Sequence, residues 1–165
     1  MSVLKGYLDT CLISAIVKSD LKEAEQLALI NIHEKYIAGE IELFASEHVE
    51  EELNKIPLNY RQQHLDMFGI FGLVPKLIVG GLTRLGPIGI PTANPKRRAL
   101  NSLLLLLPNG DDAWHLLIAS SNRITYFVTA DESTVIKYKD KIKDICGVEA
   151  LLPSEFLAYC NHDNS

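Results

Sequence analysis

Short apolar runs alternate with amphipathic stretches along the chain. Four runs have the length and the β-forming residues of buried strands: residues 3–8, 41–45, 125–129 and 148–152. Stretches with apolar positions on one side predict the helices: residues 21–38, 47–55, 59–71, 95–107 and 112–122, and a short one after the first strand. Two more are expected, one after residue 131 and one that Pro153 opens at its first turn. Strands that alternate with helices pair in parallel through right-handed crossovers. The pattern therefore predicts an α/β fold, a three-layer sandwich with a central, mainly parallel sheet.

Residues at the helix ends support these assignments. Asp20 is expected to cap the helix over residues 21–38, and Gly39 stands where a left-handed residue ends a helix. Three apolar positions of this helix share one stripe, as the buried face of a helix does: Leu27, Ile30 and Ile37. Asp111 or Asp112 is expected to cap the helix that ends near residue 122.

Residues 72–95 interrupt the pattern, because Gly and Pro recur there among branched apolar residues. We expect a short strand and a flexible loop in this segment, and loops of such length in a domain are usually functional or mobile. The chain has 165 residues, of which 47% are hydrophobic, and this suits one domain over residues 1–165.

The composition also predicts the cellular environment. Neither the leucine run at residues 103–107 nor the stretch at residues 67–82, which contains Pro75 and Lys76, supplies the roughly 20 apolar residues of a membrane span. The first residues lack the pattern of a signal peptide. The three cysteines are widely spaced and odd in number, as free thiols are. We expect a cytoplasmic protein without a membrane partner.

The net charge of −5 argues against a protein that coats polyanions in general. A cluster of carboxylates around a metal ion would add to this negative charge. Two local basic runs, at residues 96–98 and among the lysines of residues 137–143, are more typical of solvated faces than of nucleic-acid contacts.

Four carboxylates follow strands or begin helices in a way that can bring them together. Asp9 ends the first predicted strand and Asp131 follows the third, so the two share one sheet edge if these strands are neighbours, about 4.8 Å apart. Glu52 lies on the helix after the second strand, and Asp112 begins the helix before the third. Carboxylates this close keep their charge only beside a cation. Oxygen ligands without a His or Cys pattern favour Mg²⁺ or Mn²⁺.

Each of these carboxylates also has an ordinary structural explanation. A single Asp at a strand end or a helix start usually forms a cap or a turn, and only the combination of four indicates a site. Thr10 and Thr129 are candidates to contact a metal-bound water or a substrate phosphate, and strand-end hydroxyls are also often structural. His115 follows Asp112 by three residues, but a lone His on an apolar helix is more often packed than catalytic.

Four motifs occur in order along the chain: residues 7–10 (YLDT), 46–53 (SEHVEEEL), 112–119 (DAWHLLIA) and 126–131 (YFVTAD). In kind and order they resemble the motifs of the PIN-domain ribonucleases, a family that includes toxin nucleases of bacterial toxin–antitoxin systems. The resemblance implies a PIN-like sandwich with Asp9, Glu52, Asp112 and Asp131 as catalytic and metal-binding residues. Among adjacent acidic residues, Glu52 is preferred because Leu53 follows it, and Asp112 because Ala113 follows it. Residues 57–108 contain no motif of the family.

The resemblance implies a metal-dependent endoribonuclease that hydrolyses RNA phosphodiester bonds with Mg²⁺ or Mn²⁺, with an antitoxin protein and a second copy of the chain as partners. Two other functions fit parts of the pattern. One is a catalytically inactive PIN-like module that binds a protein. The other is a phosphatase with Asp9 as nucleophile, although such enzymes usually carry a second Asp two residues later, where this chain has Cys11.

Overall fold

The computed structural model describes residues 3–9, 11, 12, 15, 20–46, 57–59, 62, 76, 77 and 95–162. Its strands are β1 (Leu4–Leu8), β2 (Ile41–Ser46), β3 (Lys76–Leu77), β4 (Tyr126–Val128) and β5 (Glu149–Leu151). Strands β2, β1, β4 and β5 form the central sheet, and β3 extends it beside β2, so that the order is β3-β2-β1-β4-β5. All of these pairings are parallel. The predicted parallel sheet is confirmed.

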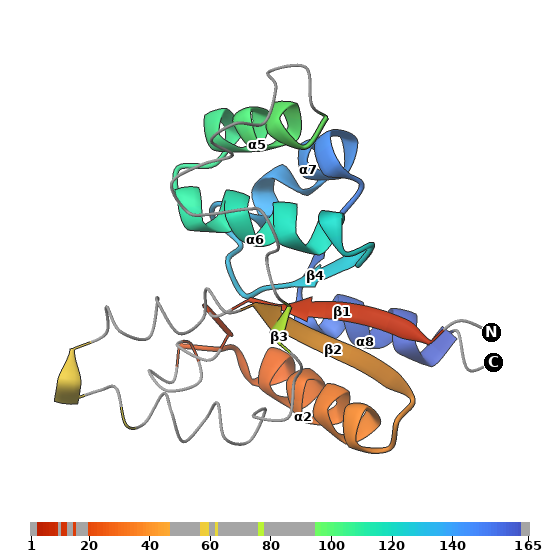
Figure 1. The fold of residues 1–165 in the computed structure, drawn as a ribbon. Helices are drawn as coiled ribbons and strands as arrows, with labels where there is room; N and C mark the ends of the chain where they lie inside the picture. The colour runs from red at the N-terminus through yellow and green to blue at the C-terminus, as the bar shows by residue number, and fades with distance from the viewer. Residues whose placement is uncertain are drawn as a thin grey trace.

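Helices cover both faces of the sheet (Figure 1). The helices are α2 (Glu23–Ile37), α5 (Pro95–Leu106), α6 (Gly110–Ser121), α7 (Lys139–Cys146) and α8 (Pro153–His162), with a 3₁₀ turn η1 (Ile136–Tyr138) before α7. Helices α5, α6 and α7 pack together on one face, and α2 packs against α8 on the other. This arrangement is the predicted three-layer α/β sandwich. Among the described residues, no helix is long and apolar enough to cross a membrane.

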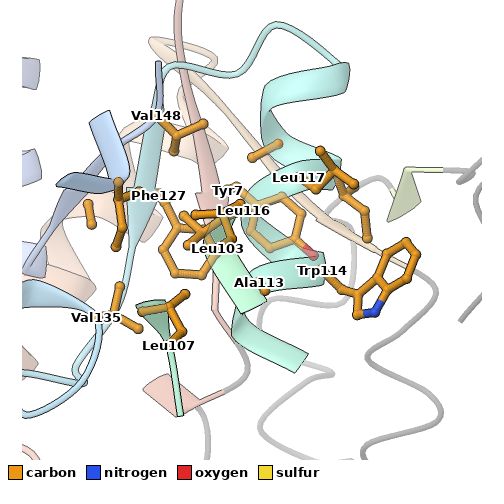
Figure 2. Packing of buried hydrophobic residues seen from close by; sticks show 14 of the residues in the cluster. Tyr7, Leu103, Leu107, Ala113, Trp114, Leu116, Leu117, Phe127, Val135 and Val148 are labelled. Atoms are coloured by element: carbon orange, nitrogen blue, oxygen red, sulfur yellow. The ribbon is translucent and has the colours of Figure 1, made fainter. Parts of the chain in front are cut away.

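The alternation of side chains along the strands produces two separate apolar cores. Tyr7, Phe127 and Ala150 are register neighbours on β1, β4 and β5, and their side chains join the core beneath α5, α6 and α7. The next residue of each strand points to the opposite face and joins the core beneath α2 and α8: Leu8, Val128 and Leu151. Figure 2 shows the first core around Tyr7 and Phe127. Both faces of the sheet are therefore buried, as expected of a parallel sheet.

The strand order reverses direction between β1 and β4. From β1 the chain proceeds outward to β2 and β3, and it then returns to the other side of β1 to form β4 and β5. Crossovers of one hand that run in opposite directions place their helices on opposite faces, and α2 and α7 do lie on opposite faces. In sheets of this kind, ligands bind beyond the carboxyl ends of the two strands at the reversal.

The structure corrects two predictions about α2. Lys22, and not Asp20, is its N-cap residue, and no side chain caps it. Its predicted apolar stripe is exposed, with exposed fractions of 55% for Leu27, 56% for Ile30 and 62% for Ile37. The buried residues lie elsewhere around the helix: Glu25, Ala28, Leu29 and Ile32. The C-terminal end is as predicted, because Gly39 has a φ of +75°.

A tertiary contact explains which side of α2 is buried. The Glu25 carboxylate accepts hydrogen bonds from the backbone N–H of Ser154 (2.8 Å) and from its hydroxyl (2.7 Å). Ser154 lies in the first turn of α8, where backbone N–H groups have no partner within the helix. A charged residue thus belongs to the packed face of α2 because it caps another helix.

Several predicted elements lie outside the described residues. These are most of the helix after the first strand, the helix over residues 47–55, most of the helix over residues 59–71, and most of the segment over residues 72–95. The short strand expected in that last segment is present as β3.

Candidate functional site

Asp9 lies at the carboxyl end of β1, beside β4. Its backbone N–H donates to the carbonyl of Val128 at 2.9 Å, which extends the β1–β4 pairing by one residue. The residue is 2% exposed. Sequence and topology together therefore place a buried carboxyl group at the point where the strand order reverses.

Two side chains hold the Asp9 carboxylate through one of its oxygens. The hydroxyl of Thr129, the residue that directly follows β4, donates to Asp9 Oδ2 at 2.8 Å. The thiol of Cys11 donates to the same oxygen at 2.9 Å, and its sulfur lies 3.1 Å from Thr129 Oγ1. Thr129 is fully buried. These contacts fix the orientation of the carboxylate relative to both strands.

Asp131 lies at the same edge, and its carboxylate organises the turn that leads to η1. Its backbone N–H donates to Thr129 Oγ1 at 3.1 Å. Its Oδ1 accepts from the Ser133 hydroxyl at 3.0 Å and the Thr134 backbone N–H at 2.9 Å, and its Oδ2 accepts from the Thr134 hydroxyl. Partial burial acts to raise the pKa of Asp131, but the hydrogen bonds from Thr134 and Ser133 outweigh it and hold the pKa below its ordinary value.

Asp112 reaches this edge from the helix layer. Helix α6 leads back across the sheet to the start of β4, so its first turn lies near the carboxyl ends of the strands. The N-cap is Asn109, whose side chain accepts from the Asp111 N–H at 3.0 Å, so the predicted cap at Asp111 or Asp112 is wrong. Asp112 is 7% exposed and belongs to the first turn, where the helix dipole favours a carboxylate.

The structure thus places Asp9, Asp112 and Asp131 at the predicted edge, and it links Asp9 and Asp131 through Thr129. Glu52 and Thr10 lie outside the described residues. Within the described part of the chain, no three His, Cys, Asp or Glu side chains are grouped so that they could hold a metal ion. The donors that are present are carboxylate oxygens, which suit a hard divalent cation better than zinc.

Cys11 is a residue of this site that the sequence did not indicate. The sequence indicated only that it is a free thiol, but in the structure this thiol contacts both Asp9 and Thr129. Burial, followed by the negative charge of Asp9, raises the pKa of Cys11 well above its ordinary value, so the thiol stays protonated and acts as a donor. The only available signal was its position two residues after Asp9.

A buried polar contact lies in the core, two residues before Asp9 on β1 and three residues after Asp112 on α6. The Tyr7 hydroxyl and His115 Nδ1 are joined by a hydrogen bond of 2.6 Å between β1 and α6. The exposed fractions are 0% for Tyr7 and 1% for His115. His115 is therefore packed, as its position on an apolar helix suggested, and it also has a specific partner.

The candidate site is an acidic edge at the reversal of a parallel sheet, held by a buried hydroxyl and a partly buried thiol. The Asp9 carboxylate and the Thr129 hydroxyl meet there, and the first turn of α6 brings Asp112 to the same end of the sheet. Compared with family models, with curated proteins and with solved structures, the chain matches none.

Proposed function

We propose that this protein is a metal-dependent endoribonuclease of the PIN type, which hydrolyses RNA phosphodiester bonds. The observation that carries the proposal is the buried Asp9 carboxylate between the carboxyl ends of β1 and β4, with Thr129 bonded to it. This is the position at which doubly wound sheets bind ligands. The assignment to the PIN type is supported by the four motifs of the sequence, which resemble those of the family.

Asp9, Asp112, Asp131 and Glu52 are the residues proposed to hold Mg²⁺ or Mn²⁺. The fit rests on donor chemistry, because Asp9 and Asp112 are buried carboxylates at one edge. When bound, such an ion lowers the pKa of a water molecule and stabilises the charge that develops on the phosphate. The protein contributes fixed geometry: Thr129 and Cys11 keep the Asp9 carboxylate in one orientation, and Asp131 keeps the following turn in place.

The basic residues differ in how well they are placed to contact RNA. Helix α5 ends beside the start of α6, so residues 96–98 stand at the opposite end of α5, about 12–15 Å along the helix axis from its last residue, Leu106. Lys137 is exposed and lies in η1, directly after the turn that Asp131 organises. We therefore assign the phosphate contact to Lys137, with binding that weakens as salt increases. Single-stranded RNA is the proposed substrate, because its phosphates and bases can reach such an edge.

The PIN type also implies its partners and its location. An antitoxin protein and a second copy of the chain are the proposed partners, and the cytoplasm is the proposed compartment. These follow from the resemblance of the motifs alone.

The test is cleavage of labelled single-stranded RNA by the full chain, with Mg²⁺ or Mn²⁺ and then with EDTA. We expect cleavage that EDTA abolishes. In Asp9→Asn, the rate should fall by at least about 100-fold, because direct ligands matter more than the outer contacts that cost roughly 10- to 100-fold. The matched control is Asp140→Asn, which removes an exposed carboxylate of α7 and should leave the rate unchanged.

Three results would contradict the proposal. An unaltered rate in Asp9→Asn would remove Asp9 from the site. Release of phosphate from small phosphoesters without cleavage of RNA would support the phosphatase. Absence of both reactions, together with tight binding of a copurifying protein, would support the inactive binding module.

A further inference from the structure

The hydrogen bond between Tyr7 and His115 links the central strand to the helix that carries Asp112. It spans 2.6 Å between the Tyr7 hydroxyl and His115 Nδ1, with the ring centroids 5.6 Å apart and the rings tilted by 55°. Figure 2 shows the Tyr7 ring inside the apolar core, beside Phe127 and close to Leu103 and Leu116. A directional polar contact in such surroundings fixes a distance that apolar contacts alone leave adjustable.

Two residues further along β1 and β4, a second pair of side chains is in contact, closer to the site. Tyr7 and Asp9 are two residues apart on β1 and its extension, so their side chains point to the same face of the sheet. Phe127 and Thr129 have the same relation on β4. The Tyr7 and Phe127 rings stack with centroids 5.5 Å apart, and Asp9 and Thr129 share a hydrogen bond. The aromatic pair, Tyr7 and Phe127, thus lies directly behind the polar pair of the site, which is Asp9 with Thr129.

Helix α6 contributes one residue beside each of these pairs. His115 and Asp112 are three residues apart and therefore lie on one side of α6. The step from His115 back to Asp112 is about 4.5 Å along the helix. The step from Tyr7 to Asp9 is about 6.6 Å along the strand. Both steps lead toward the carboxyl edge of the sheet, so Asp9 and Asp112 each lie one short step from the contact between Tyr7 and His115.

We propose that Tyr7 and His115 are positioning residues, which hold the first turn of α6 against the end of β1 and keep Asp112 opposite Asp9. As far as metal binding is concerned, this inference rests on the proposed function. The alternative is a purely structural pair that stabilises the core without affecting the two carboxylates.

The test uses Tyr7→Phe in the full chain, because this change removes the hydroxyl and keeps the ring that stacks on Phe127. Two properties are measured: the affinity for Mn²⁺ alone, by calorimetry, and the hydrogen exchange of the Trp114 and His115 amides in the metal-free protein, by NMR. These amides close the first turn of α6. We expect Mn²⁺ affinity to fall by about tenfold or more. We also expect faster exchange in the first turn and unchanged exchange in the last turn.

Two further variants separate positioning from general destabilisation. The amide of His115→Asn can donate and accept near the position of Nδ1, so it should restore most of the affinity that His115→Leu loses. Tyr138 packs against the same core, and Tyr138→Phe should leave both properties unchanged.

The outcomes are distinct. If wild-type protein binds Mn²⁺ and Tyr7→Phe changes only the free energy of unfolding, the positioning role is wrong and the proposed function is unaffected. If wild-type protein binds no Mn²⁺ but Tyr7→Phe speeds exchange in the first turn, the positioning role stands and the metal site is wrong. Unchanged exchange and unchanged affinity would overturn the inference outright.

Discussion

The Thr129 hydroxyl joins the ends of β1 and β4 at the level of single atoms. It donates to Asp9 Oδ2 and accepts from the Asp131 N–H, so its bonding capacity is largely used within the protein. The sequence left two roles open for this residue, a substrate contact or a structural one. These bonds favour the structural role, in which Thr129 fixes a carboxylate that itself meets the ligand.

Asp131 leads to a prediction about pH. Because its pKa is lowered in the folded protein, its ionised form stabilises the fold above the ordinary carboxyl pKa, and this contribution is lost as the pH falls through the lowered value. We expect Asp131→Asn to reduce the free energy of unfolding by about 1 kcal/mol near neutral pH. The difference from wild type should shrink at about pH 3, below the ordinary Asp value of about 3.9.

The measurement is urea unfolding in EDTA, which keeps divalent ions out of the comparison. Asp140→Asn, at an exposed position in the first turn of α7, serves as the control and should change the free energy of unfolding by no more than about 0.5 kcal/mol at either pH. A difference for Asp131→Asn that stays constant with pH would show that the hydrogen bonds from Ser133 and Thr134 do not depend on the charge.

At the scale of elements, α2 shows how a distant contact decides which side of a helix is buried. Ile30 and Ile32 are two residues apart, yet Ile30 is mostly exposed and Ile32 is fully buried. We expect Ile32→Ala to lower the free energy of unfolding by about 2–5 kcal/mol, because it leaves a cavity against α8 and the sheet. The same change at Ile30 should alter it by no more than about 0.5 kcal/mol.

Urea unfolding of the two alanine variants provides the comparison, and each serves as the control for the other. Equal losses would mean that the stripe of Leu27, Ile30 and Ile37 is covered in solution. In that case the apolar face expected from the sequence would be correct for the protein in solution.

The same elements show what the sequence could predict. Both ends of each of the strands β1, β2, β4 and β5 lie within one residue of the expected range, because short runs of β-forming residues between turns are a local signal. The face of α2 was predicted wrongly because Glu25 is buried by Ser154, 129 residues away. The cap of α6 was predicted wrongly because the helix begins two residues earlier than expected, where the Asn109 side chain accepts a hydrogen bond from the Asp111 N–H.

Some features of the candidate site could also be predicted from the sequence, and others could not. The edge shared by Asp9, Asp112 and Asp131 follows from alternating strands and helices, which the pattern of the chain reveals. The contacts of Cys11 and the bond between Tyr7 and His115 depend on how α6 and the first turn after β1 sit on the sheet. The spacing of residues along the sequence does not determine how these elements pack on the sheet.

At the scale of the whole molecule, a bound ion should stabilise the folded state. A ligand that binds only the folded protein adds about 2.7 kcal/mol when its concentration is 100 times Kd. For a chain of this size, we expect Mn²⁺ to raise Tm by roughly 5–10 °C at that concentration. The shift should disappear with EDTA and be absent in Asp9→Asn.

Differential scanning calorimetry measures this shift. Ca²⁺ and Mg²⁺ at the same concentration show whether it depends on the ion, and Asp140→Asn shows whether it depends on surface charge. An equal shift in wild type and Asp9→Asn would place the binding elsewhere on the protein.

The position of β1 in the sheet also has a consequence for synthesis of the chain. This strand is made before the other strands of the sheet, yet it lies in the middle, and Tyr7 pairs with Phe127, 120 residues later. At about 5–20 residues per second, the emerging polypeptide waits on the order of ten seconds for that neighbour. During this interval the edge of β1 that later pairs with β4 stays unpaired, and the side chains of Tyr7 and Leu8 lack their neighbours on β4, so a chaperone can bind this strand.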